Sequence, residues 1–187
     1  MSTVSVNWAR REDVPAILAL ANWAADHTVA NLATAHEPLS EWQASFDGTS
    51  QKYPWIVARD TSERVVGFAK GAPYKARGAY AWTAEVTVYI DVSVHGKGVG
   101  TRLYDVLVPT LRAQGYVTLV AGITVPNTPS ERLHERFGFV RCATYHRVGF
   151  KEGKWHDVGF WELMVRTGDD APGAIADTRS VGVGLRQ

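Results

Sequence analysis

Apolar and polar residues alternate most regularly between residues 80 and 94 of this chain. Strict alternation is typical of a strand that buries one face, so this stretch is expected to form the central strand of a sheet. The apolar face carries Val86, Val88, Ile90, Val92 and Val94. A turn at residues 95–100 then leads into a helical pattern, which predicts a strand–turn–helix unit.

Helical and extended patterns alternate along the rest of the chain. Strands are expected at residues 4–8, 55–58, 65–69, 117–123, 139–148 and 158–165, the last two paired across residues 151–154. Helices are expected to begin near residues 12 and 38 and to span residues 98–114 and 127–137. Pro109 lies inside the third helix, where a proline costs about 3 kcal/mol, and predicts a kink or break near residues 105–108. This order predicts an α/β fold, a mixed central β-sheet flanked by helices on both faces.

A single domain accounts for most of the chain. Its 187 residues are 45% hydrophobic and 21% charged, which is typical of a globular domain. We expect residues 1–166 to form this domain and residues 167–187, which show no periodicity, to form a flexible C-terminal tail. A net charge of +1 does not favour binding to nucleic acid or membranes. The lack of a signal-like N-terminus and of a long apolar segment predicts a cytoplasmic protein.

Redox and metal chemistry find little support in the sequence. The single cysteine, Cys142, cannot form an internal disulfide and is expected to be an idle thiol. The histidines and the cysteine do not have the spacing of metal ligands, so no metal is expected.

Three glycines, Gly96, Gly98 and Gly100, lie between the central strand and the following helix. Glycine allows positive φ and a close approach to a ligand. The first N–H groups of a helix, together with its dipole, favour phosphate. The spacing matches neither the dinucleotide motif G-x-G-x-x-G nor the nucleotide P-loop. The residues alone therefore leave two interpretations open, a phosphate-binding turn and a tight turn without a ligand.

Two side chains are candidates for proton transfer. Glu85 interrupts the apolar central strand, where partial burial would favour a working base. His134 lies one turn into a predicted helix and could relay a proton or orient a substrate. Each also has a structural interpretation, a strand-end glutamate paired with a basic side chain and a histidine that only packs. Lys75 and Arg77 share one face of an extended stretch and form either an anion site or a solvated basic loop.

The glycine turn resembles the pyrophosphate loop of the GCN5-related N-acetyltransferases (GNAT), Q/R-x-x-G-x-G/A, with His95 at the first position. Further segments resemble one branch of this superfamily, the phosphinothricin N-acetyltransferases. The segments most specific to the branch are Tyr-Ala-Trp-Thr-Ala-Glu at residues 80–85 and Trp-His-Asp-Val-Gly-Phe-Trp at residues 155–161. The resemblance extends over residues 6–165 and implies the GNAT fold, with acetyl-CoA in a groove at the central strands.

The resemblance also implies roles for individual residues. Glu85 is implied as the general base and His134 as a second catalytic residue. Acetyl-CoA is implied to contact Val88, Tyr89, Ile90, Gly96, Lys97, Gly98, Val99, Gly100, Thr101 and Asn127. The acceptor is implied to contact Lys75, Arg77, Tyr80, Val86, Thr87 and Val158. The implied reaction, in a homodimer, is attack of the α-amine of phosphinothricin or of methionine sulfoximine or sulfone on the thioester.

Several positions depart from the branch. Val86 stands where a serine is usual, the segment near Val29 is one residue longer, and Leu32 lies near the position of an expected aromatic residue. Because that segment normally caps the amino acid, the acceptor specificity of this chain can differ. Two alternatives stay open, an acetyltransferase with a different small amine acceptor and a non-catalytic acyl-CoA-binding sensor module.

Overall fold

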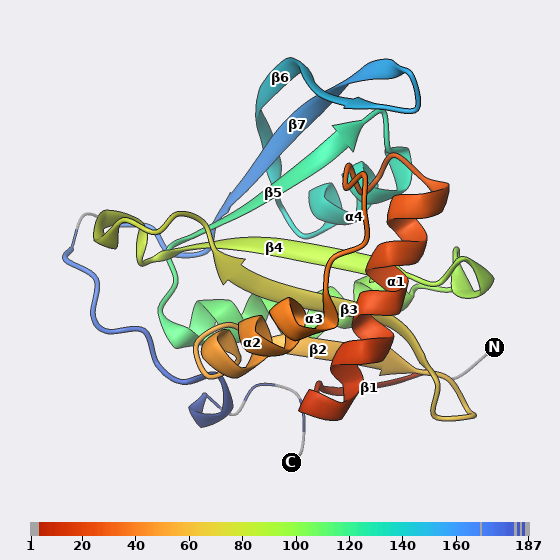
Figure 1. Cartoon of the computed structure of the whole chain (residues 1–187). Coiled ribbons are helices and arrows are strands. Elements are labelled where there is room, and N and C mark those ends of the chain that lie inside the picture. Colours follow the sequence, from red (N-terminus) through yellow and green to blue (C-terminus); the bar gives the residue numbers. More distant parts are fainter. Residues whose placement is uncertain (1–3, 169, 182, 184, 186–187) are drawn as a thin grey trace.

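The computed structural model describes residues 4–168, 170–181, 183 and 185. The strands are β1 (Ser5–Trp8), β2 (Trp55–Arg59), β3 (Val65–Pro73), β4 (Thr83–Ile90), β5 (Thr118–Val125), β6 (Val140–Lys151) and β7 (Lys154–Met164). The α-helices are α1 (Val14–His27), α2 (Leu39–Thr49), α3 (Val99–Gln114) and α4 (Thr128–Arg136). Their order along the chain is the predicted one (Figure 1), so the expected α/β fold is confirmed.

The seven strands form one sheet in the order β1-β2-β3-β4-β5-β7-β6. Neighbouring strands run antiparallel, except for β4 and β5, which are parallel and connected through α3. The parallel pairing is short, because it covers only residues 83–85 of β4 and 118–120 of β5. The sheet is therefore mixed, as predicted, and its shortest strand pairing is the one between β4 and β5.

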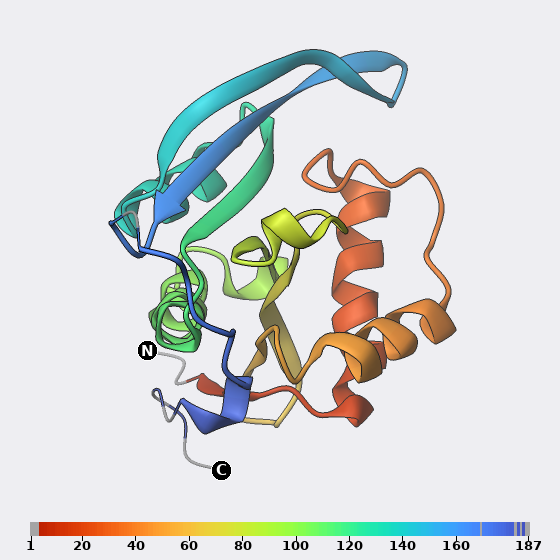
Figure 2. The same ribbon diagram turned by 90° about the vertical axis from the view of Figure 1, so that its left-hand side faces the viewer.

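Helices cover both faces of the sheet (Figure 1). On one face α1 and α2 pack over a core cluster that contains Trp42, Trp55 and Phe68. On the other face α3 packs against β2, β3 and β4, while α4 lies beside β5. Figure 2 shows the β6–β7 hairpin rising away from the β1–β4 half of the sheet. None of the helices in the described part of the chain has the length and apolar character needed to cross a membrane.

Strand β4 is shorter than the predicted central strand at residues 80–94. It begins at Thr83 because residues 78–80 form a 3-10 turn. It ends at Ile90 because the carboxylate of Asp91 accepts hydrogen bonds from the main-chain nitrogen (2.9 Å) and the hydroxyl (2.6 Å) of Ser93. These bonds start a second 3-10 turn, which turns the chain toward α3.

Helix α3 is continuous although it contains Pro109. A break near residues 105–108 is therefore wrong, and the alternative prediction of a kink there stays a prediction. The physical reason is packing, since Leu103, Leu107 and Leu111 are all 0% exposed. Each buried leucine contributes about 1.5–3 kcal/mol, and together they outweigh the roughly 3 kcal/mol cost of an interior proline.

The segment after residue 166 packs against the domain where the structure describes it. The main-chain nitrogen of Ala176 donates to the carbonyl of Gln114 (2.9 Å), whose Nε2 donates to the carbonyl of Ala176 (2.8 Å). Thr178 is 2% exposed, and its main-chain nitrogen donates to the carbonyl of Gln51 (2.6 Å). These contacts differ from the expected flexible tail at residues 167–187. Residues 169, 182, 184 and 186–187 of that segment lie outside the described residues.

Candidate active site

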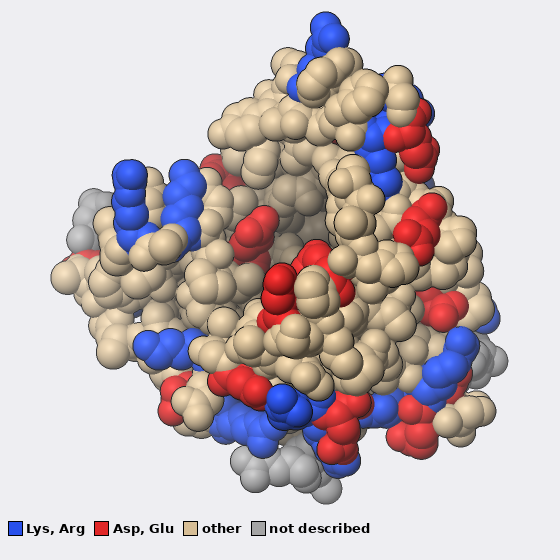
Figure 3. All heavy atoms as spheres, in the orientation of Figure 1, with Lys and Arg blue, Asp and Glu red and all other residues tan. Residues whose placement is uncertain are grey.

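A groove opens where β4 and β5 separate. Their pairing stops at Glu85 and Val120, but β4 continues to Ile90 and β5 to Val125. Among the described residues no strand pairs with β4 on this side beyond Glu85. The space between the strands belongs to a cavity of about 1190 Å³, which exceeds the roughly 300–1,000 Å³ of most small-molecule sites. Figure 3 shows it as a hollow with acidic side chains at its rim.

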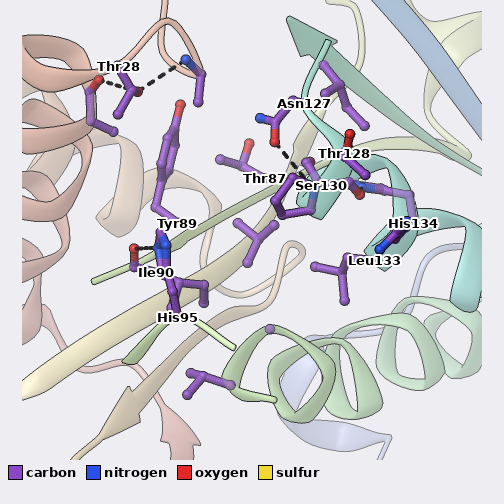
Figure 4. Close-up of a pocket in the computed structure, with 18 of the residues that line it drawn as sticks. Thr28, Thr87, Tyr89, Ile90, His95, Asn127, Thr128, Ser130, Leu133 and His134 are labelled. Carbon is purple, nitrogen blue, oxygen red and sulfur yellow. Dashed lines mark hydrogen bonds between the residues drawn. The ribbon is translucent and has the colours of Figure 1, made fainter. Parts of the chain in front are cut away.

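Two walls enclose the groove (Figure 4). One wall consists of Tyr89, Ile90 and His95, with Thr28 from the loop after α1. The opposite wall consists of Asn127, Thr128, Ser130, Leu133 and His134 at the start of α4 and along it. Thr87 lies between the walls on β4. The groove therefore brings together segments on both sides of the β4–β5 junction.

The turn between β4 and α3 forms one end of the groove. Gly96 and Gly98 have φ angles of 73° and 75°, which favour glycine. In the described part of the chain, no atom lies within 4 Å of the position that a Cβ would take at either residue. Residues 98–101, at the N-terminus of the 16-residue helix α3, line the groove at the positive end of the helix dipole. This geometry suits a phosphate group.

Other residues of this turn have structural contacts. A Cβ on Gly100 would lie 3.1 Å from Cδ2 of Leu133, so this glycine lets α3 approach α4. Nε2 of His95 donates to the carbonyl of Ile90 (2.9 Å), which fixes the ring at the groove wall. Lys97 points elsewhere, because its ammonium donates to the carbonyl of Ser93 (2.9 Å). Of the predicted diphosphate contacts, residues 96 and 98–101 line the groove and Lys97 does not.

Glu85 lies at the vertex of the separation, as the last residue of β4 that pairs with β5. Its side chain lines the groove and is partly buried. Burial raises the pKa of its carboxyl, while the nearby ammonium of Lys70 acts in the opposite direction. A carboxylate with a raised pKa at the inner end of a groove is suited to accept a proton near neutral pH.

His134 is 3% exposed, and both of its ring nitrogens are hydrogen-bonded. Nδ1 donates to the carbonyl of Ser130 (2.8 Å), so Nε2 accepts from the hydroxyl of Tyr104 (2.8 Å). Burial lowers the pKa of the ring, which is therefore neutral at pH 7. The ring lines the groove. Its contacts favour a histidine that holds α4 on α3, and its predicted catalytic role stays a prediction.

Asn127 is the N-cap of α4. Its Oδ1 accepts from the main-chain nitrogen of Ser130 (3.3 Å), and its own main-chain nitrogen donates to Oε1 of Glu131 (2.7 Å). This reciprocal cap fixes the start of the helix. Figure 4 shows the amide nitrogen of Asn127 turned toward the groove, which supports the predicted contact with a bound molecule.

The predicted acceptor residues divide into two groups. Val86 and Thr87 line the groove, whereas Lys75, Arg77, Tyr80 and Val158 do not. Lys75 and Arg77 are exposed on the loop between β3 and β4, where Figure 3 shows basic side chains beside the hollow. The ammonium of Lys75 lies 5.2 Å from the centre of the Tyr80 ring. Val158 lies on β7, opposite Thr124 of β5.

The loop after α1, which the resemblance implies as a cap over the amino acid, is held by a contact that the sequence did not reveal. Residues 28–30 line the groove, and Lys151 at the end of β6 holds them in place. Its ammonium donates to the carbonyls of Ala25, Thr28 (2.9 Å) and Asn31 (2.7 Å). A local sequence pattern does not show which carbonyls a lysine contacts.

This chain is similar to known acetyltransferases. The model of the acetyltransferase (GNAT) domain family matches residues 6–159. Phosphinothricin N-acetyltransferase of Streptomyces viridochromogenes is 38% identical over 159 residues, which cover 85% of this chain and 86% of that protein. The L-methionine sulfoximine/L-methionine sulfone acetyltransferase of Pseudomonas aeruginosa is 34% identical over 171 residues, which cover 91% of this chain and 99% of that protein.

A solved structure also has this architecture. The phosphinothricin acetyltransferase of the GNAT superfamily from Sinorhizobium meliloti, in complex with acetyl-CoA, aligns with a TM-score of 0.82 at 28% identity. The alignment covers 87% of this chain and 88% of that one. The fold, the separated central strands and the extent of the family match lead to one conclusion: this chain belongs to the GNAT acetyltransferase family.

Proposed function

We propose that this acetyltransferase transfers the acetyl group of acetyl-CoA to the α-amino group of a small amino acid such as phosphinothricin, methionine sulfoximine or methionine sulfone. The position of Glu85 carries the proposal, because a partly buried carboxylate stands at the vertex of the groove. The acceptor class rests on the names of the two similar enzymes. Acetylation of such an acceptor would serve resistance or detoxification.

The groove fits acetyl-CoA through its main chain. Residues 88–90 of β4 offer N–H and carbonyl groups, which β5 does not pair, to the amides of the pantetheine arm. Residues 96 and 98–101 offer N–H groups to the diphosphate, and Asn127 lies further along the wall. When bound there, the cosubstrate supplies a thioester carbonyl as the acetyl donor.

Glu85 serves as the base for the acceptor amine. An α-amino group has a pKa near 8, so it is mostly protonated at neutral pH. Glu85 takes its proton, directly or through water, and the freed lone pair attacks the thioester carbonyl. Main-chain N–H groups at the vertex stabilise the negative charge that develops on the carbonyl oxygen. Collapse of this intermediate breaks the C–S bond and releases the CoA thiolate, which takes up a proton to leave as the free thiol. Thr87 shares a face of β4 with Glu85 and contacts the acceptor.

Lys75 and Arg77 attract the acceptor in this proposal. Both side chains are exposed on the loop between β3 and β4, and phosphinothricin carries anionic groups. Positive charge at the entrance raises the local concentration of an anionic substrate. A direct contact with the acceptor, also predicted for Tyr80 and Val158, stays a prediction.

We also propose a homodimer formed through the β6–β7 hairpin. Tyr145, Phe150 and Trp155 on this hairpin are 57%, 55% and 50% exposed. An edge strand with exposed aromatic side chains is typical of an interface. The variant Phe150→Glu should elute as a monomer in size-exclusion chromatography with light scattering, and a wild-type monomer would contradict the proposal. The single domain at residues 1–166 and the cytoplasmic location stay predictions.

An acceptor screen tests the proposed reaction. Release of free thiol from acetyl-CoA should require phosphinothricin, methionine sulfoximine or methionine sulfone, and mass spectrometry should detect the N-acetylated product. A polyamine and a peptide N-terminus serve as the competing acceptors. Glu85→Gln should lower kcat/KM at pH 7 by about 10²-fold or more, with unchanged CoA binding in calorimetry. Turnover of only the competing acceptors would refute the acceptor class, and an unchanged Glu85→Gln rate would refute the base.

A further inference from the structure

A largely buried lysine, Lys70, lies on β3 close to the vertex of the groove. Its ammonium is 4.2 Å from the centre of the Trp55 ring and 4.6 Å from the centre of the Trp42 ring. Two indole faces within about 6 Å of one ammonium form a favourable cation–π site. The lysine is therefore fixed in place, although a buried charge is costly unless it interacts with an opposite charge.

The sheet register directs Lys70 toward the proposed base. Lys70 pairs with Thr87 of β4, and Glu85 lies two residues from Thr87 on the same face of the sheet. Diagonal neighbours of this kind have Cα atoms about 7–8 Å apart, within the reach of long side chains. Lys70 and Glu85 therefore lie on the same face of the β3–β4 pair, and the charge of Lys70 acts on Glu85 through space.

We propose that Lys70 is a positioning residue for Glu85: its ammonium, held between two indole rings, keeps the Glu85 carboxylate ionised and directed at the acceptor amine. This inference rests on the proposed function, because it assigns to Glu85 the role of base. Lys70 itself does not line the groove. It acts through Glu85 and does not touch the substrate.

Burial and neighbouring charges act in opposite directions on both members of the pair. Burial raises the pKa of the Glu85 carboxyl, and the charge of Lys70 offsets part of this rise. On balance the pKa of Lys70 is lowered, because the effect of burial exceeds the opposing effect of the Glu37 and Glu85 charges. Glu37 precedes α2, and its Oε2 accepts from Nε1 of Trp42 (2.7 Å). Tyr89 on the same face has its pKa raised to about 12 by burial and by Glu37, so it is neutral.

A purely structural role is the competing explanation. In that case Lys70 only fills space between Trp42 and Trp55, and its loss affects stability alone. The two explanations differ in one measurable quantity, the pH at which Glu85 loses its proton. An activity loss at a single pH does not separate them.

The experiment is the pH dependence of kcat/KM for the full-length enzyme, with methionine sulfoximine or another acceptor that passes the screen. Lys70→Met keeps the volume and removes the charge, so the acidic limb should move to higher pH by about one unit. Lys70→Arg keeps the positive charge and places it on a planar guanidinium that stacks on indole rings. The acidic limb of this variant should stay at the wild-type position. Glu37→Gln keeps the acceptor for Trp42 and removes a competing negative charge, so its limb should not move to higher pH.

An unshifted limb in Lys70→Met, in a variant that melts cooperatively, would overturn the inference and leave the proposed reaction standing. An equal shift in Lys70→Arg and Lys70→Met would overturn it as well, because the charge would then be irrelevant. A measurement that needs no turnover covers the case in which no acceptor is found. It is a ¹³C NMR titration of the glutamate carboxyls, in which the Glu85 signal is identified by its absence from Glu85→Gln. If no acceptor is acetylated, a higher Glu85 pKa in Lys70→Met still supports the electrostatic link, and an unchanged pKa refutes it.

Discussion

Replacing Tyr104 by phenylalanine tests whether His134 positions α4 or transfers protons. The change removes one hydroxyl, which donates to Nε2 of His134 at 2.8 Å. The aromatic contacts of the ring with Phe137 and Phe139 remain. Because the pair is buried, the change leaves Nε2 without its donor, which costs about 1–3 kcal/mol. In a protein of this size, the Tm should therefore fall by roughly 2–12 °C.

Calorimetry measures the melting temperature of Tyr104→Phe, and initial rates at saturating acetyl-CoA measure its kcat. If His134 only holds α4 on α3, kcat should change little at a temperature at which the variant is folded. A fall in kcat of about 10²-fold, the size of a lost proton transfer, with an unchanged Tm would refute this reasoning. It would place the Tyr104–His134 pair on a proton path to the leaving thiolate.

Three further predictions follow from the site and its surroundings. Since burial holds the pKa of His134 below its ordinary 6.5, its contribution to stability should be complete above pH 6.5 and decline as the pH falls toward the lowered pKa. Urea titrations from pH 7.5 to 5 measure this loss, and an equal loss in His134→Gln would contradict it. Lys151→Met removes the donor for three carbonyls beside the groove, so the acceptor KM should rise while kcat stays close to wild type; an unchanged KM would count against the loop's role. Gly98→Ala forces a residue with a side chain to adopt φ 75° and should weaken CoA binding by about 1 kcal/mol or more. Gly48→Ala in α2 is the control, because no described atom lies within 4 Å of the position that its Cβ would take. This control should leave CoA binding, measured by calorimetry, unchanged.

The order of elements could be predicted because each element has its own local period. Alternation marked the strands and glycines marked the helix ends, so every described strand and α-helix has a counterpart in the pattern. The two ends of β4 were not predicted correctly from the sequence. A 3-10 turn precedes the strand and the side-chain hydrogen bonds of Asp91 end it, although the alternating pattern continues at both ends. The break expected at Pro109 does not occur for the opposite reason. The burial of α3 in the core outweighs the local free-energy cost of a proline inside a helix.

The candidate site was partly predictable for a similar reason. Glu85, residues 86–90 and the glycine turn are consecutive in sequence, so one pattern located one side of the groove. The loop after α1 has no period of its own, and its position depends on Lys151 from the far end of the chain. Lys70 was missed because an alternating strand does not distinguish a solvated lysine from one enclosed by two indoles. Such contacts arise only when distant segments pack.

The early end of the β4–β5 ladder has a consequence for how this protein can evolve. A ligand that completes the backbone of a strand is recognised by peptide groups, which every amino acid possesses. Side chains around the groove, such as Val86 or the residues near Val29, can therefore be exchanged with little loss of affinity for acetyl-CoA. New acceptors become accessible through ordinary point mutations, while the acetyl donor stays the same.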